Sequence, residues 1–124
     1  MARILLIDDD ELLRDTVSQM LELDRHQVTE ATDGEDGLRR FRDGSFDLVI
    51  TDVLMPRTDG AEVISRIRAI APRLPIIAVS GGRRVLSPEF NLQTAALAGA
   101  TLQLAKPFSR QQLQSAVQQA LATA

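Results

Sequence analysis

The fold is indicated by the segment Leu48-Val49-Ile50-Thr51-Asp52-Val53-Leu54-Met55-Pro56. It is an apolar run that ends in a carboxylate, with a proline four residues later. Residues 48–50 are aliphatic and β-branched without alternation, which is typical of a strand buried on both faces. Pro56 has no N–H to donate to a ladder, so the strand is expected to stop near Asp52. The segment therefore predicts a carboxylate at the carboxyl end of a core strand, the edge at which open parallel α/β sheets bind ligands.

Four further strands and five helices are predicted around this segment. The strands are expected over residues 4–7, 27–31, 76–79 and 101–105. A helix is expected after each of the five strands, with N-caps at Asp10, Thr32, Asp59 and Ser109 and a fourth helix that begins at Ser87-Pro88 or Asn91. Leu12 in the first helix and Ile70 in the third are expected to face the core. Such alternation predicts a parallel sheet that is covered by helices on both faces.

Composition limits the kind of protein this is. The chain has 124 residues, 44% hydrophobic and 25% charged, so we expect one domain over residues 1–124 with no output domain. The absence of cysteine excludes disulfides and thiolate metal sites, and a cytoplasmic location fits it. A net charge of −3 and 3% aromatic residues disfavour nucleic-acid binding, and no apolar run is long enough to span a membrane. The one histidine, His26, is expected to be an exposed turn residue and not a phosphodonor.

Polar side chains follow four of the five predicted strands. Asp8 and Asp9 follow the first strand, Asp52 the third, Ser80 the fourth and Lys106 the fifth. Buried ionisable groups are costly without partners, so their placement at one edge of a sheet predicts a functional site. Carboxylate oxygens suit a cation such as Mg²⁺. A carboxylate nucleophile beside a metal, a hydroxyl and a lysine suits phosphoryl transfer.

Four short motifs carry a resemblance to a known family. They are Ile7-Asp8-Asp9-Asp10, Thr51-Asp52-Val53-Leu54-Met55-Pro56 with Asp59-Gly60, Val79-Ser80-Gly81 and Lys106-Pro107-Phe108. In these motifs the chain resembles the response-regulator receiver domains of two-component signalling over essentially its whole length. The resemblance implies an α/β fold of the flavodoxin-like, doubly wound type, with a five-stranded parallel sheet in the order 2-1-3-4-5 and five helices.

The resemblance also implies a role for each matching residue. It makes Asp52 the phosphoacceptor, with Ser80 and Lys106 in contact with the phosphoryl group. It assigns Mg²⁺ binding to Asp8, Asp9, Asp52 and the backbone carbonyl of Leu54. The phosphoryl group would come from a histidine on a partner kinase or phosphotransfer protein, and the output would be changed binding of a downstream protein partner. The chain would then be a signalling phosphoacceptor and not a turnover enzyme on a separate substrate. A cis bond before Pro107 is also expected from the family.

Two departures from the family pattern leave alternatives open. Gln103 stands three residues before Lys106, where the family usually has an aromatic residue, and the path from Ser80 to Lys106 is longer than usual. A receiver-like interaction module that works without phosphorylation is therefore a second hypothesis, and the chain could also be a receiver excised from a longer protein. A phosphohydrolase of the haloacid dehalogenase type is disfavoured, because Leu54 stands where that family has its second aspartate.

Overall fold

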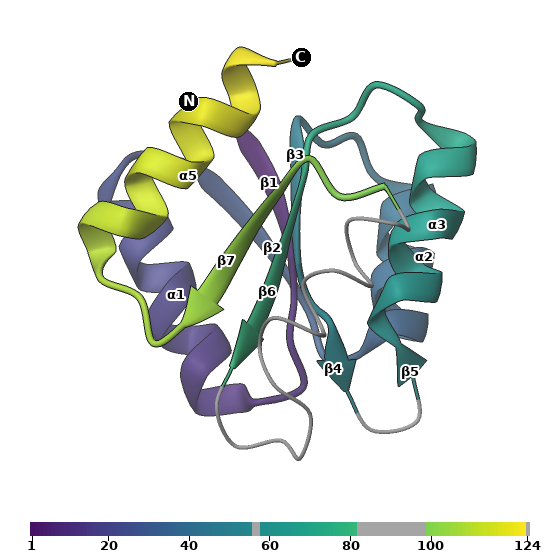
Figure 1. Cartoon of the computed structure of the whole chain (residues 1–124), viewed down its shortest axis with the longest axis horizontal. Coiled ribbons are helices and arrows are strands. Elements are labelled where there is room, and N and C mark those ends of the chain that lie inside the picture. Colours follow the sequence, from purple (N-terminus) through teal and green to yellow (C-terminus); the bar gives the residue numbers. More distant parts are fainter. Residues whose placement is uncertain (56–57, 82–98, 124) are drawn as a thin grey trace.

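The central element is a five-stranded parallel sheet (Figure 1). The computed structural model describes residues 1–55, 58–81 and 99–123. The strands are β1 (Arg3–Ile7), β2 (Gln27–Ala31), β3 (Leu48–Asp52), β6 (Ile76–Gly81) and β7 (Leu102–Lys106). They lie in the order β2-β1-β3-β6-β7, and every neighbouring pair is parallel. Counted along the chain, β6 and β7 are the fourth and fifth strands of this sheet, so the predicted strand order 2-1-3-4-5 is confirmed.

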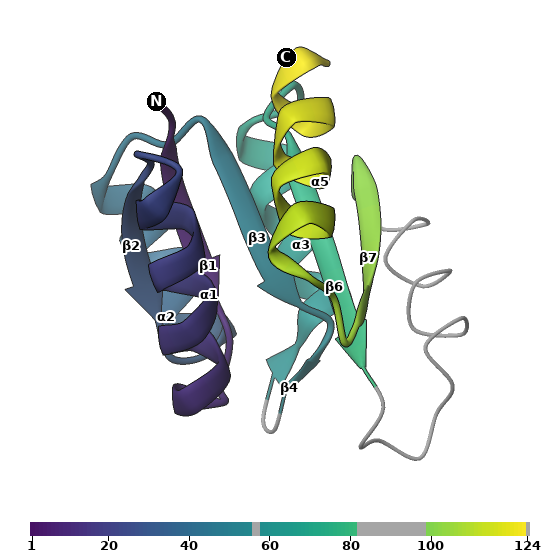
Figure 2. The same ribbon diagram turned by 90° about the vertical axis from the view of Figure 1, so that its left-hand side faces the viewer.

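Helices cover both faces of the sheet. The described residues contain α1 (Glu11–Leu23), α2 (Gly34–Asp43), α3 (Gly60–Ile70) and α5 (Arg110–Ala122). α1 and α5 lie on one face, and α2 and α3 lie on the other (Figures 1 and 2). The described part of the chain thus has four helices where five were predicted, and the remaining one was expected within residues 83–99, nearly all of which lie outside the described ranges. None of these four helices is long and apolar enough to cross a membrane.

The protein has two hydrophobic clusters, one on each face of the sheet, because the central strands are buried on both sides. In β1, Ile4 and Leu6 pack beneath α1 and α5, whereas Leu5 and Ile7 pack beneath α2 and α3. The same alternation holds in β3 and β6, which accounts for their continuous apolar sequences. Each fully buried Leu or Ile contributes about 1.5 to 3 kcal/mol relative to an exposed one. The strand ends that carry the polar residues are therefore anchored in a dry and densely packed layer.

Helix capping agrees with the sequence in two of three testable cases. The Asp10 side chain accepts the Leu13 N–H at 3.2 Å, and Ser109 begins α5 with both arms of its capping box in place. The predicted N-cap at Thr32 is wrong, because α2 begins one residue later and Asp33 caps it by accepting the Asp36 N–H at 2.8 Å. Both Thr32 and Asp33 are good capping residues, so composition alone could not separate them.

The structure corrects the predicted burial or exposure of three residues. Ile70 is 58% exposed and Leu12 is 78% exposed, so both were wrongly assigned to the core. Ile70 is the last residue of α3. Leu12 lies on the solvent face of α1, in line with Thr16, Gln19 and Leu23, which are also exposed. His26 is half-buried, because its turn abuts the start of β1 and its Nδ1 accepts the Ala2 N–H at 3.0 Å. Burial, helped by the positive amino terminus and opposed by Asp24, lowers the pKa of His26 below its ordinary value.

A small hairpin between β3 and α3 was not predicted. It consists of β4 (Leu54–Met55) and β5 (Thr58–Asp59), paired antiparallel. Strands of two residues are too short to show any periodicity, so the sequence gives no signal for them. The chain then turns into α3, with the Gly60 N–H donating to the Val53 carbonyl at 3.0 Å.

Candidate functional site

The register of the sheet brings the predicted site residues to one edge. Ile7 of β1 pairs with Thr51 of β3, so Asp8 follows directly beside Asp52. Asp52 ends β3 and lies opposite Val79 of β6. These strands are parallel, so their carboxyl ends meet at the same edge, as the sequence predicted.

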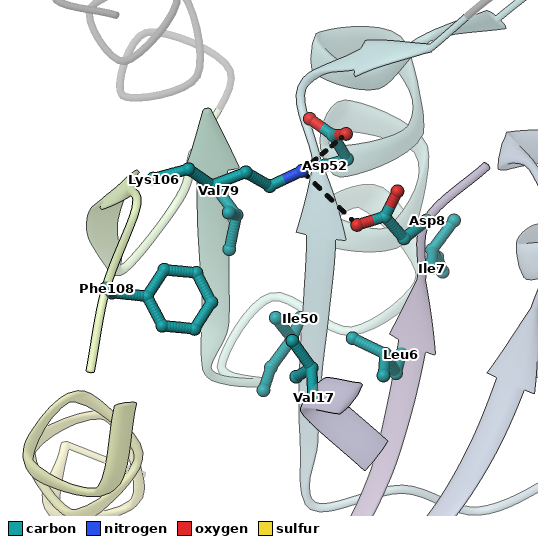
Figure 3. Close-up of a pocket in the computed structure, with 9 residues that line it drawn as sticks. All are labelled: Leu6, Ile7, Asp8, Val17, Ile50, Asp52, Val79, Lys106 and Phe108. Atoms are coloured by element: carbon teal, nitrogen blue, oxygen red, sulfur yellow. Dashed lines mark hydrogen bonds and ion pairs between the residues drawn. The ribbon is translucent and has the colours of Figure 1, made fainter. Parts of the chain in front are cut away.

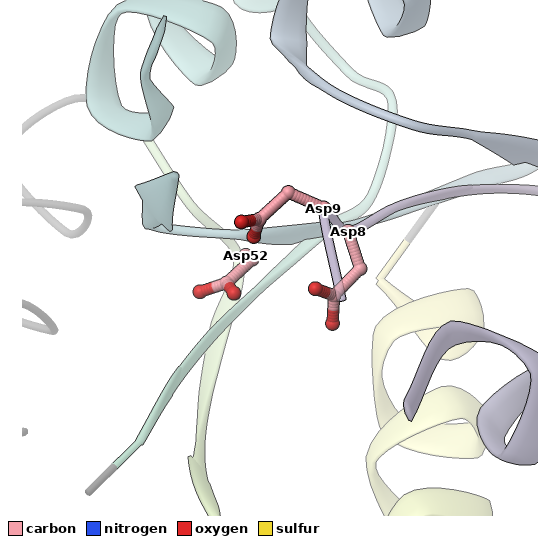
Figure 4. Close-up of side chains that lie close together, drawn as sticks. All are labelled: Asp8, Asp9 and Asp52. Carbon is pink, nitrogen blue, oxygen red and sulfur yellow. The ribbon is translucent and has the colours of Figure 1, made fainter. Parts of the chain in front are cut away.

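Three carboxylates converge there. Asp8, Asp9 and Asp52 each offer an oxygen atom within 4.8 Å of the others (Figure 4). Asp8 is only 5% exposed and Asp52 7%, while Asp9 is half-buried. Two like charges 4.8 Å apart repel by about 3 kcal/mol at an effective dielectric constant of about 20. A cation between the oxygens would relieve this repulsion, and hard oxygen donors are the ligands that Mg²⁺ prefers.

Lys106 partly offsets the negative charge. Its Nζ lies 3.2 Å from Asp52 Oδ2 and 3.3 Å from Asp8 Oδ2 (Figure 3). One ammonium against three carboxylates leaves a formal charge of −2, which a divalent cation matches. The donor set and its charge therefore fit Mg²⁺.

Ser80 lies beside this group, at the end of β6. It pairs with Ala105, and the next pair in the ladder is Gly81 with Lys106. Ser80 is fully buried, and its Oγ forms no hydrogen bond to any residue that the structure describes. An unsatisfied buried hydroxyl costs about 1 to 3 kcal/mol. Such a group at a strand end is available to an incoming oxygen-rich ligand.

A small pocket opens beneath Lys106. Asp8, Asp52 and Lys106 form its polar mouth (Figure 3). Its walls are apolar and come from Leu6, Ile7, Val17, Ile50, Val79 and Phe108. Apolar walls exclude water and strengthen the interactions between the charges at the mouth.

Three other expectations have different outcomes. Leu54 lies in β4, two residues beyond Asp52, and its carbonyl as a metal ligand stays a prediction. The Lys106–Pro107 peptide bond is cis, as expected. Gln103 is exposed and is the second residue of β7, so the aromatic residue usual in the family has no counterpart at that position.

Arg14 was missed by the sequence analysis. Its Nη1 donates to the carbonyl oxygen of Asp8 at 2.8 Å, and its Nε donates to Glu30 Oε1 at 3.1 Å. Arg14 lies one turn into the helix that follows the acidic cluster, and Glu30 lies near the end of β2. The position of an arginine one turn into this helix was the available sequence signal, but charged surface residues are too common for it to identify the contact.

Comparison with known proteins identifies the family of the chain. The family model of the response regulator receiver domain matches residues 4–118. The DNA-binding transcriptional regulator NtrC of Azospirillum brasilense is 38% identical over 120 residues, which are 97% of this chain and 24% of that protein. The response regulator MprA of Mycobacterium sp. (strain KMS) is 34% identical over 111 residues, which are 90% of this chain and 46% of that protein. The chain thus spans between about a quarter and about half of these relatives.

A solved structure of similar length gives the same result. A response regulator receiver domain protein from Clostridium thermocellum superimposes with a TM-score of 0.89 at 32% identity. The match covers 98% of this chain and 95% of that one. Together with the family match, it shows that the chain belongs to the family of response regulator receiver domains, the phosphoacceptor domains of two-component signalling.

Proposed function

We propose that Asp52 accepts a phosphoryl group from a phosphohistidine on a partner histidine kinase or phosphotransfer protein, in a Mg²⁺-dependent reaction. The observation that carries this proposal is the position of Lys106, which contacts Asp52 and Asp8 at once beside a third carboxylate. A buried carboxylate, a lysine and oxygen ligands for a cation are the groups that this transfer needs.

We propose a chemical role for each group at this edge. A carboxylate oxygen of Asp52 attacks phosphorus while the bond from phosphorus to the histidine nitrogen breaks, and the imidazole keeps that electron pair. Lys106 and the Ser80 hydroxyl hold oxygens of the transferred group. Asp8, Asp9 and the Leu54 carbonyl, with Asp52 itself, would hold Mg²⁺, which neutralises charge on the phosphoryl oxygens when bound.

The acyl phosphate changes the charge and shape of the carboxyl edge. We propose that a downstream protein reads this change by binding, so that residues 1–124 act as a cytoplasmic signalling domain and not as a turnover enzyme. The net charge of −3 and the 3% aromatic content support a protein partner over nucleic acid.

Intact-mass spectrometry tests this proposal. The chain is incubated with Mg²⁺ and a small acyl-phosphate donor, beside the Asp52→Ala variant and a chelator control. We expect one phosphoryl adduct on the unsubstituted chain and none on Asp52→Ala or with chelator. Asp43→Ala is the matched control, because it removes an exposed carboxylate at the end of α2, and it should gain the adduct as the unsubstituted chain does. An adduct on folded Asp52→Ala at the same yield would contradict the proposal.

A further inference from the structure

The backbone of Asp8 lies just outside the sheet ladder. β1 ends at Ile7, and the Asp8 N–H still reaches the Ala31 carbonyl at 3.2 Å. The Asp8 carbonyl accepts its hydrogen bond from Arg14 Nη1, at 2.8 Å. A buried carbonyl without a partner costs free energy comparable to a lost hydrogen bond. Arg14 therefore supplies the hydrogen-bond donor that a neighbouring strand no longer supplies to the Asp8 carbonyl.

Arg14 is itself held in one orientation. Its side chain is only 12% exposed, and its Nε forms an ion pair with Glu30 Oε1 at 3.1 Å. The guanidinium is a rigid planar fork, so fixing one arm on β2 aims the other at the Asp8 carbonyl. The contact joins α1, the edge strand β2 and the peptide that follows β1.

We infer that Arg14 is a positioning residue that fixes the Asp8 peptide and so aims the Asp8 carboxylate into the cation site. The carboxylate has its own contacts, because Oδ1 accepts the Asp10 N–H at 2.9 Å and Oδ2 lies 3.3 Å from Lys106 Nζ. With the backbone fixed at both N–H and carbonyl, the Cα–Cβ bond has one direction, and the contacts of Oδ1 and Oδ2 then select the rotamer. This inference deepens the proposed function and rests on it.

The charge of Arg14 and its hydrogen bond have opposite effects on metal binding. A cation near three carboxylates repels Mg²⁺, whereas a fixed Asp8 favours its binding. Glu30 lies 3.1 Å from Arg14 and offsets its charge, so we expect the hydrogen bond to dominate. Loss of Arg14 should therefore weaken Mg²⁺ binding, while a purely electrostatic role would make it tighter. The sign of the change separates the two roles.

The test follows backbone amide signals by NMR in the full chain, with and without Mg²⁺. The Asp9 amide nitrogen is bonded to the Asp8 carbonyl carbon, so its signal reports the Arg14 hydrogen bond even without metal. In Arg14→Gln we expect a shifted Asp9 amide, faster hydrogen exchange at the Asp10 amide and about tenfold weaker Mg²⁺ binding. Arg14→Lys should recover part of the affinity, because lysine keeps one donor but not the fork.

Two controls isolate the contact. Glu30→Gln keeps an acceptor for Arg14 Nε and leaves the Asp8 bond in place, so the Asp9 amide signal should not shift. It also removes the charge that offsets Arg14, so its Mg²⁺ affinity should fall, but by less than in Arg14→Gln. Arg66→Gln removes the same charge from an exposed ion pair with Glu62 on α3, on the opposite face of the sheet, and should change neither readout. Urea unfolding without Mg²⁺ confirms that each variant is folded.

Equal or tighter Mg²⁺ binding by folded Arg14→Gln would overturn the inference, whatever its amide spectrum. If the unsubstituted chain shows no saturable Mg²⁺ binding, the proposed function itself fails first. The two failures are therefore distinguishable.

Discussion

Lys106 on β7 and Asp52 on β3 form an ion pair of 3.2 Å although β6 lies between their strands. The lysine side chain is long enough to cross the end of β6 and also to reach Asp8 on the far side of Asp52. Its side chain is 19% exposed, so little water screens these pairs. A single cation thus links the carboxyl ends of three strands.

Replacing Lys106 with methionine keeps the side-chain volume and removes the charge. We expect Lys106→Met to bind Mg²⁺ more tightly, since a competing cation is gone, and to form the phosphoryl adduct about a hundredfold more slowly. Amide titrations with Mg²⁺ and the initial rate of adduct formation measure the two effects. Lys106→Arg keeps the charge in a different shape, so its Mg²⁺ affinity and its rate of adduct formation should lie between those of the unsubstituted chain and of Lys106→Met. An unchanged rate in Lys106→Met would show that the lysine has no part in transfer.

Gly60 packs against the backbone that carries Asp52. A Cβ atom at this position would lie 2.5 Å from the Asp52 carbonyl oxygen and also overlap the Val53 backbone. We expect Gly60→Ala to lower the free energy of unfolding by about 1 to 3 kcal/mol and to slow adduct formation.

Gly37→Ala is the matched control for Gly60→Ala in urea unfolding. Its added Cβ would meet only side-chain atoms, those of the buried Ile7, whereas at Gly60 it would meet the backbone itself. Alanine also favours the interior of α2 by about 0.5 to 1 kcal/mol over glycine. We therefore expect a smaller loss than in Gly60→Ala, and the reverse order would contradict the packing seen at Gly60.

Asp36 makes stability depend on pH. Burial alone would raise its pKa, but hydrogen bonds from the Thr32 N–H, Arg40 and Arg39 outweigh burial and lower it. Because the folded pKa is below the unfolded value of about 3.9, the stabilisation is complete above that pH and is lost as the pH falls through the folded pKa. We expect Asp36→Asn to cost about 1.5 to 3 kcal/mol at neutral pH and less in acid.

Urea unfolding at neutral and acidic pH measures the Asp36 effect. Asp33→Asn is the control, because it removes the same charge from the same helix end and asparagine still caps the helix. A gap between Asp36→Asn and the unsubstituted chain that stays constant down to about pH 3 would rule out the ionised carboxylate as the cause.

Arg25 has a left-handed backbone, with φ of +67°, just after α1. Its N–H donates to the Glu22 carbonyl at 2.9 Å, as in a common helix ending that favours glycine. We expect Arg25→Gly to raise the free energy of unfolding by about 1 kcal/mol. Arg25→Ala keeps the Cβ atom and its strain, so it should be less stable than Arg25→Gly. The opposite order in thermal or urea unfolding would disprove the strain.

The strands could be predicted because their sequences are extreme. Runs such as residues 48–50 and 76–79 are too apolar for any position but a sheet buried on both faces, and their ends follow from neighbouring polar residues. Helix ends were harder, because Thr32 and Asp33 are equally good caps. Ile70 satisfied the helical period but is the last residue of its helix and is 58% exposed.

The site could be predicted where strand ends supply it. Asp8, Asp9, Asp52 and Lys106 were expected to meet, and the register of a parallel sheet brings them together. Arg14 could not be predicted, because its contact depends on how α1 lies against β2 and on a carbonyl just past a strand end. Such a contact follows from packing, and the spacing of charged residues in the sequence is too common to identify it.

The most direct test of the account locates the transferred group on the chain. The phosphorylated chain is treated with borohydride, which reduces an acyl phosphate to an alcohol and so converts the modified aspartate to homoserine, and its peptides are sequenced by mass spectrometry. The account predicts homoserine at position 52 alone, formed only when Mg²⁺ is present during phosphorylation. Homoserine at another aspartate, or the same yield at position 52 with chelator, would contradict it.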